Sequence, residues 1–286
     1  MLKTFLRAVR RARGHKERVH YRLLSASGTR PKVGVSYSVW DGEELLEFAI
    51  RSIRSEVDYV SVAWQRLSWY GNPCDPGLEQ HLLNLKEKGL IDELLFFEPD
   101  LSLPPGINET NKRNVGLEAA RRAGCKYFLT LDADEFFEAE PFREALDYVM
   151  RNSITHSACN QVGYTDIDCR KSLPADWFVP FAYRISRGEK FVHNAFGETP
   201  WLIDPTKKIP ITSESRICFI GQVIMHHYSG VRKNLDRKIE NSSASLTPQM
   251  TQANKDRAEQ GRREVESGLL SGNYVKVPNR FGIRIE

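Results

Sequence analysis

Two aspartates with a single residue between them are the side chains of this sequence best placed to do chemistry. Asp132 and Asp134 follow directly on the apolar run 127–131, and on an extended backbone side chains two positions apart point to the same side. Two neighbouring carboxylates repel each other unless a cation lies between or near them. Aspartate oxygens suit Mg²⁺ and Mn²⁺, and such an ion keeps open positions for diphosphate oxygens. The pair therefore predicts a cation site at the end of a strand.

Basic and polar residues lie about twenty positions before this pair. Lys112, Arg113 and Asn114 stand at the start of a helix predicted over 111–123. A helix N-terminus and a guanidinium both favour phosphate oxygens. The alternatives are an ordinary solvated helical turn for these residues and a solvated loop beginning at the aspartates.

The elements that must position these residues alternate between strands and helices. Strands are predicted at 33–39, 59–64, 94–97 and 127–131, and helices after Asp41, which can cap its helix, over 78–88 and over 111–123. This alternation predicts a largely parallel sheet with crossover helices. Ligands of such sheets bind at the carboxyl ends of the strands, where the aspartates stand.

Beyond Met150 the alternation weakens. Antiparallel strands are expected within 177–192 and at 217–225, and a surface helix from Pro248. The predicted organisation is a basic arm over 1–31, a domain over 32–247 that divides after 137, and a C-terminal helix and tail over 248–286.

Charge is distributed unevenly along the 286 residues. Ten Lys/Arg against one acid give residues 1–32 a charge of +9, which leaves −5 for the rest of a chain whose net charge is +4. A basic arm suggests contact with an anionic surface, either membrane or nucleic acid. Apolar residues at helical spacing favour an interfacial helix, so the expected partner is a membrane, contacted through 1–22, and not nucleic acid. A solvated or domain-packing helix is the alternative.

Neither a membrane span nor a secretory signal is expected, because no apolar run approaches the roughly 20 residues of a span and no cleavage site follows the first charges. The five cysteines form no CxxC pair, which indicates neither a disulfide framework nor a zinc cage. Reduced thiols in the cytoplasm, with the chain at most peripheral to the inner face of a membrane, fit best.

The segments 111–120 and 127–135 together resemble the family-2-like glycosyltransferases of the GT-A fold, in which a similar A/K-R-N-x-G-L-x-x-A helix precedes a strand ending in L-D-x-D. The segment 39–53 is similar to their Y-N-E-E-x-x-L … L-x-S-I. The resemblance covers Val33 to about Phe137. It implies an α/β GT-A fold, Rossmann-like, with a mostly parallel central sheet, helices on both faces and a smaller antiparallel C-terminal part. It also implies a metal-dependent transfer of a sugar from a UDP- or GDP-linked donor to a glycan or lipid-linked acceptor.

Carried over residue by residue, the resemblance implies a set of donor contacts. The nucleobase end would be lined by the residues that end the first strand, the diphosphate, ribose or sugar would lie near the basic helix, and Asp132 would meet the ribose or the metal. The implied set is Ser38, Val39, Trp40, Asp41, Gln65, Lys112, Arg113, Asn114, Asp132 and Ala133. Gln65 stands where the family usually has an acidic residue that reads the base.

The segment 226–233 resembles the H-x-x-G-x-x-K with which several GT-A enzymes complete their site, matching at His227, Gly230 and Lys233, although the Pro-Trp that usually follows is missing. Neutral imidazole is a good ligand for Mn²⁺. The resemblance implies that His227 joins Asp132 and Asp134 in holding Mn²⁺ or Mg²⁺, and that Lys233 contacts the diphosphate. A structural histidine at a strand end is the alternative.

An inverting transferase needs a carboxylate that takes the proton of the acceptor hydroxyl. The candidates are Asp166, Asp168, Asp176, Glu189, Glu198 and Asp204. Glu198 is preferred because it lies near aromatic residues that can stack on a sugar. A surface glutamate is the alternative for Glu198, and a retaining mechanism would need no such base.

Other functions fit the sequence less well. A haloacid-dehalogenase-type phosphatase also uses D-x-D after a strand, but it places Thr or Val where Phe136 stands, and its pair normally follows the first strand. The first strand lacks the glycine-rich loop of sugar-nucleotide pyrophosphorylases, and no G-x-G-x-x-G of dinucleotide enzymes follows a strand. A GT-A-like domain that binds a sugar nucleotide without turnover is the non-enzymatic alternative.

Overall fold

A computed structural model describes residues 30–285, apart from 176–177, 187, 196–203 and 268–272. Contacts divide the chain into Met1–Arg30 and Pro31–Glu286. The amphipathic helix predicted over 1–22 lies outside the described residues. Among the described helices, none has the length and apolar character that crossing a membrane requires.

The first four strands form the parallel half of the sheet. They are β1 (Val33–Val39), β2 (Tyr59–Trp64), β3 (Glu93–Phe96) and β4 (Tyr127–Asp132), in the spatial order β3-β2-β1-β4. Their short apolar, β-branched runs suit strands that are covered on both faces. The mostly parallel α/β sheet predicted for this half is confirmed.

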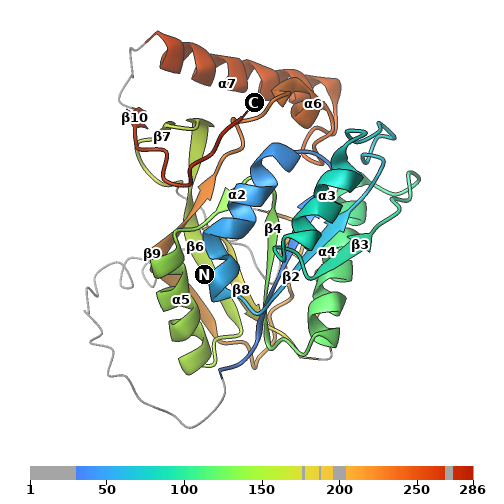
Figure 1. Cartoon of the computed structure of the whole chain (residues 1–286), viewed down its shortest axis with the longest axis vertical. Coiled ribbons are helices and arrows are strands. Elements are labelled where there is room, and N and C mark those ends of the chain that lie inside the picture. Colours follow the sequence, from blue (N-terminus) through green and yellow to red (C-terminus); the bar gives the residue numbers. More distant parts are fainter. Residues whose placement is uncertain (1–29, 176–177, 187, 196–203, 268–272, 286) are drawn as a thin grey trace. The chain divides into compact units, whose positions relative to one another are not determined.

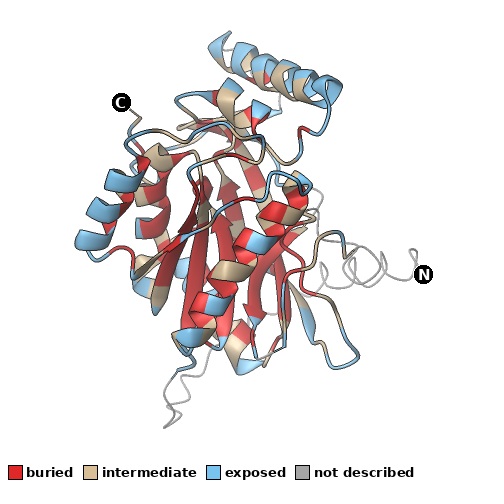
Figure 2. Cartoon of the chain, turned by 90° about the vertical axis from the view of Figure 1, so that its right-hand side faces the viewer, coloured by how far each residue is buried: buried red, intermediate tan, exposed pale blue. Residues whose placement is uncertain are grey.

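Helices cover both faces of these strands (Figures 1 and 2). Alternate residues of β1, from Val33 to Val39, pack in one apolar cluster with α2, α3 and α5. The residues between them face α4, where Gly116 lies against Ser36 and Gly34 lies against Ala120. The bounds of the helices are α2 Glu43–Ile53, η1 Arg54–Glu56, α3 Leu78–Glu87, α4 Pro105–Arg122 and α5 Ala139–Arg151.

Beyond β4 the sheet becomes largely antiparallel. β8 pairs with β4, and β6 pairs with β8, both antiparallel, while β9 runs parallel to β6 and antiparallel to β5. Helices α6 and α7 lie together beyond one end of the sheet (Figure 1). The remaining bounds are β5 Glu135–Phe136, β6 His156–Asp166, β7 Cys169–Lys171, β8 Phe178–Arg184, β9 Ile217–His227, α6 Leu235–Glu240, α7 Pro248–Glu266 and β10 Tyr274–Lys276.

Two predicted helix starts are wrong. Asp41 does not cap α2: the N-cap is Gly42, whose φ of +85° suits glycine, and it makes no side-chain capping bond. Helix α4 begins at Pro105, not at 111, because proline is well suited to the first helical position. Lys112 and Arg113 therefore lie in the middle of α4 and not in its first turn.

Candidate functional site

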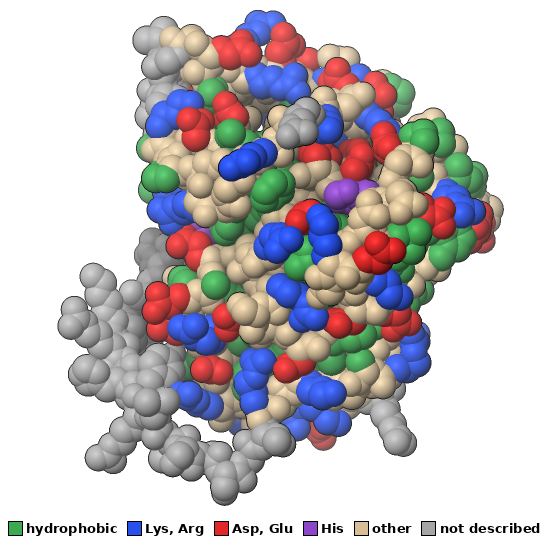
Figure 3. Space-filling view, in the orientation of Figure 1, with side chains coloured by type: hydrophobic (Ala, Val, Ile, Leu, Met, Phe, Trp, Pro, Cys, Tyr) green, Lys and Arg blue, Asp and Glu red, His purple; other side chains and the backbone are tan. Residues whose placement is uncertain are grey.

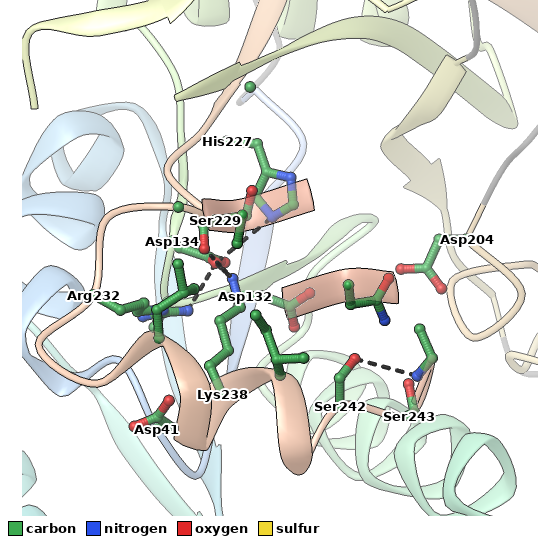
Figure 4. Close-up of a pocket in the computed structure, with 18 of the residues that line it drawn as sticks. Asp41, Asp132, Asp134, Asp204, His227, Ser229, Arg232, Lys238, Ser242 and Ser243 are labelled. Atoms are coloured by element: carbon green, nitrogen blue, oxygen red, sulfur yellow. Dashed lines mark hydrogen bonds and ion pairs between the residues drawn. The ribbon is translucent and has the colours of Figure 1, made fainter. Parts of the chain in front are cut away.

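A cavity of about 780 Å³ opens where β1 and β4 end (Figure 4). Its floor contains the two aspartates predicted to carry chemistry, and α4, β9, α6 and α7 contribute its walls. The predicted residues that line it are Ser38, Trp40, Asp41, Lys112, Asp132, Ala133, Asp134 and His227. The structure thus brings together, in one cavity, residues that are up to 189 positions apart.

Asp134 is almost completely buried and is held by two cations. Its Oδ2 atom lies 2.7 Å from Arg232 Nη2 and 2.6 Å from Lys238 Nζ, and His227 Nε2 lies 3.6 Å from the same oxygen. Burial opposes ionisation, but Arg232, Lys238 and His227 more than offset it and hold the pKa of Asp134 well below its usual range. Asp134 is therefore a permanent anion that orients two cations.

Asp132 has a different set of partners. Its carboxylate lies 3.1 Å from Arg113 Nη2 and 3.0 Å from Lys207 Nζ. Burial again opposes ionisation, and Arg113 and Lys207 overcome it and lower the pKa of Asp132. Both aspartates line the cavity, but the Asp132 side chain is 31% exposed and that of Asp134 only 3%, so Asp132 is the more accessible of the two. A turn after Asp132 breaks the extended backbone, so the two carboxylates contact different cations of the protein.

Arg113 and Lys112 are both fully buried, side by side on α4. Arg113 donates to Asp132, Glu109, Thr130 and Thr206, so it joins α4 to the end of β4. Lys112 Nζ donates to the carbonyl of Val39 at 2.8 Å, at the end of β1. Burial lowers the pKa of Lys112 to about 7, although Glu109 opposes the shift.

Several predicted residues lie outside the cavity wall. Gln65 is buried and donates to the carbonyl of Leu67. Asn114 is bonded in both directions to the backbone of Phe191, a structural arrangement. The backbone N–H of Lys233 donates to Glu44, and the carbonyl of Val39 is taken by Lys112. Glu198 lies outside the described residues.

Sequence reasoning missed several wall residues. Arg232 lines the cavity where its neighbour Lys233 does not, because the chain turns after β9, where the N–H of Gly230 donates to the carbonyl of Tyr164 and that of Val231 to the carbonyl of Tyr228. Lys238 comes from α6, a short helix that carried no recognised motif. Of the described carboxylates considered as a base, only Asp204 lines the cavity, beside Glu109. Arg232 lies inside the segment 226–233, whose basic residues the sequence already marks as suited to a diphosphate, although Lys233 was the residue predicted to make the contact; no local signal marks Lys238.

The residues expected to hold a divalent ion do not fit one in this arrangement. Among the described side chains, no group of three His, Cys, Asp or Glu could hold a metal ion. The oxygen of Asp134 nearest His227 already accepts from Arg232 and Lys238, and Asp132 faces Arg113 and Lys207. A metal at Asp134 would lie against two positive charges.

Charge along the cavity is polarised. At the Asp134 end, Arg232 and Lys238 are in contact with one carboxylate, and Asp41 and Glu44 also act on Arg232. At the Asp132 end, four carboxylates face two cations, Arg113 and Lys207; the carboxylates are Glu109, Asp132, Glu135 and Asp204. The second end is therefore the more negative and favours a hydroxyl or a proton, whereas the N–H groups of Arg232 without a partner among the described residues favour an anion at the first.

Comparison with known proteins shows that the chain resembles solved structures in its fold. No family model and no curated protein matches the chain. Solved structures of glycosyltransferases are among those that it resembles in fold. A crystal structure of S. aureus TarS is 14% identical with a TM-score of 0.43, over 77% of this chain and 41% of that one.

Two other similar structures hold nucleotide sugars. S. aureus TarS 1-349 in complex with UDP-GlcNAc is 12% identical, with a TM-score of 0.41, over 71% of this chain and 59% of that one. Mannosyltransferase PcManGT from Pyrobaculum calidifontis, in complex with GDP-Man and Mn²⁺, is 12% identical, with a TM-score of 0.45, over 73% of this chain and 60% of that one. The chain thus spans less than two thirds of these structures, and likeness at this level assigns it neither a ligand nor an activity.

Proposed function

We propose that this chain is a glycosyltransferase that moves a sugar from a nucleoside-diphosphate donor to an acceptor hydroxyl. The observation that carries the proposal is the placing of Asp132 at the carboxyl end of β4, in the floor of a cavity whose neighbouring end holds Arg232 and Lys238. At about 780 Å³ the cavity has the size of a small-molecule site. Such sheets bind ligands at this edge.

The polarity of the cavity orients the donor. The diphosphate is placed toward Lys238 and Lys112, and the nucleobase toward Ser38, Trp40 and Asp41 at the end of β1, as the family resemblance implies. The sugar then lies over Asp132, whose carboxylate can accept from ribose or sugar hydroxyls.

In the transfer, the bond between the anomeric carbon and the β-phosphate oxygen breaks, and its electron pair stays on that oxygen. The acceptor hydroxyl oxygen forms the new bond to the anomeric carbon and gives its proton to a carboxylate. Asp204 is the proposed base within the described part of the chain, since it lines the cavity at the end rich in carboxylates. Glu198 remains a prediction for the same role.

A Mn²⁺ or Mg²⁺ ion, expected from Asp132, Asp134 and His227, has no part in the transfer we propose, because Asp134 is committed to Arg232 and Lys238. A glycan or lipid-linked acceptor, and peripheral membrane contact through residues 1–22, remain predictions from the sequence.

The test is binding and hydrolysis of a panel of UDP- and GDP-linked sugars by the full chain, with and without Mn²⁺. We expect at least one donor to bind and to be hydrolysed slowly, and Asp132→Asn to lower turnover by about 100-fold, as loss of a group that orients the reacting atoms does. Asp147→Asn, on the outer side of α5, is the matched control.

Two outcomes distinguish the alternatives. If a donor binds but none is turned over in the presence of acceptor sugars and lipids, the chain is a domain that binds sugar nucleotides without catalysis. Hydrolysis of simple phosphate monoesters in place of nucleotide sugars would favour the phosphatase. If no nucleotide sugar binds under any condition, the proposal is wrong.

A further inference from the structure

The carboxylate of Asp134 is occupied by this chain's own cations. Arg232 Nη2 and Lys238 Nζ both lie within 2.7 Å of Asp134 Oδ2, and Figure 4 shows the two side chains reaching that oxygen from the turn after β9 and from α6. A divalent ion at this oxygen would be close to two positive charges, and the repulsion between such charges rises steeply as water is excluded. The position of a metal is therefore already filled by positive charge.

Arg232 cannot move away easily. Its side chain is 5% exposed, and it lies against Gly42, where an added Cβ would come within 1.6 Å of Nη1. The guanidinium therefore packs against the backbone at the start of α2, where Gly42 carries no side chain, and it forms a buried part of the cavity wall.

Arg232 and Lys238 both have N–H groups beyond those that donate to Asp134. Among the described residues, Nε and Nη1 of Arg232 have no hydrogen-bond partner. Lys238 Nζ donates to Asp134 and to the carbonyl of Ser229, which uses two of its three protons. Buried donors without partners are costly, and an anion in the cavity would satisfy them. Lys238 is 25% exposed, so a ligand can reach it.

Given a nucleotide-sugar donor, as proposed, we infer that Arg232 and Lys238 bind its diphosphate directly and take the place of a divalent ion. When the bond from the anomeric carbon to the β-phosphate oxygen breaks, the charge that stays on the departing diphosphate is stabilised by these fixed cations. Asp134 orients them and does not touch the donor. Acidic and basic side chains of the described residues are interspersed over the face shown in Figure 3.

The test titrates UDP and GDP into the full chain by calorimetry, once in excess EDTA and once in Mn²⁺. The nucleotide that binds should do so in EDTA, with an affinity within about threefold of that in Mn²⁺. Lys238→Met should weaken binding in EDTA by about 10- to 100-fold, the usual effect of losing a hydrogen bond to a charged group. Lys238→Arg, which keeps the charge, should retain most of the affinity.

Lys276→Met is the control, because it removes the same charge from an exposed lysine that pairs with Asp168 outside the cavity. Its affinity should equal that of the natural chain. Binding that requires Mn²⁺, or a Lys238→Met chain that binds as tightly as the Lys276→Met chain, would overturn the inference and leave the proposed function standing. If neither nucleotide binds in either condition, both are overturned. The EDTA comparison needs no variant, so it decides the matter even if Lys238→Met fails to fold.

Discussion

Arg113, predicted to contact the donor, lies behind the cavity wall and donates to four side chains. Its guanidinium is completely buried and reaches Glu109 on its own helix, Asp132 at the end of β4, and Thr206. A buried charge is tolerated only when it is paired and hydrogen-bonded, and removing one partner leaves the other groups uncompensated. Arg113 therefore stabilises the contact between α4 and the end of β4, next to the site.

Arg113→Met should lower the free energy of unfolding by about 3–5 kcal/mol, because Asp132 and Glu109 lose a buried cation. The measurement is urea unfolding followed by circular dichroism. Arg143→Met is the matched control: Arg143 is exposed on α5, with Glu140 as its salt-bridge partner, and its midpoint should not change. If the two variants had equal urea midpoints, Arg113 would not stabilise the fold as expected.

Lys112 should make donor binding depend on proton uptake. Burial lowers its pKa from 10.5 to about 7, so at pH 8 most of the free chain has a neutral Lys112. A bound diphosphate favours the charged form and raises that pKa, so binding at pH 8 should take up close to about one proton per site. At pH 6 and below, most of the lysine is already charged and uptake should nearly disappear.

Calorimetry in two buffers of different ionisation enthalpy measures this uptake directly. Lys112→Met should abolish it at pH 8 and weaken binding, whereas Lys276→Met should leave it unchanged. Equal uptake by the natural chain and by Lys112→Met would mean that another group takes the proton.

From the sequence, the residue types that form the candidate site could be predicted better than their positions in the fold. Lys112 and Arg113 are predicted from their charge to lie at a helix N-terminus, but α4 begins at Pro105 and both residues lie in its middle. Arg232 replaces Lys233 at the cavity because a turn decides which of two adjacent side chains points inward. Contacts such as Arg113 to Thr206, 93 positions apart, depend on how the chain folds back and leave no local pattern.

At the scale of elements, the site depends on how closely α4 lies against β1. Gly116 on α4 faces Ser36, and an added Cβ would come within 2.2 Å of Ser36 Oγ and 2.5 Å of its Cβ. Small residues on both sides thus allow a close approach. The same helix carries Lys112 and Arg113 to the ends of β1 and β4, so a shift of α4 would displace both.

Gly116→Ala should therefore destabilise the chain by about 1–3 kcal/mol, the usual cost of overpacking a close contact, even though alanine favours a helix by roughly 1 kcal/mol over glycine. Nucleotide affinity should fall in parallel. Adding Ser36→Gly removes the atoms that the new methyl meets, so the two changes together should destabilise the chain by less than the sum of the two single changes, even though glycine weakens a strand interior. A double-mutant cycle of urea midpoints measures the coupling, and additive effects would contradict direct contact.

The elements that the sequence predicts well are those with a strong local pattern. β1 and β2 have the predicted bounds because their apolar runs end at polar or turn residues. The start of α4 was missed because Pro104, Pro105 and Gly106 are typical of a loop, although a proline fits the first helical position. β6, which pairs with three other strands, was not predicted, since its burial alternates irregularly over eleven residues.

At the scale of the molecule, residues near the C-terminal end pack into the same apolar core as β1. Ile283 is 1% exposed and belongs to the same apolar cluster as the residues of β1 and α2. Phe281 packs against Phe136 and Tyr228, and Tyr228 donates its backbone N–H to the carbonyl of Asp134. The last residues thus support the strand and the turn that hold the candidate site.

Ile283→Ala should lower the stability of the whole described domain by about 2–5 kcal/mol, as loss of a buried aliphatic side chain does. If the core is one cooperative unit, circular dichroism and tryptophan fluorescence should report the same, lowered urea midpoint. Leu173→Ala, at a side chain 75% exposed, should leave the midpoint unchanged. A lowered midpoint in one signal only would instead mean that the C-terminal segment unfolds separately, and the candidate site would then lose its support before the sheet unfolds.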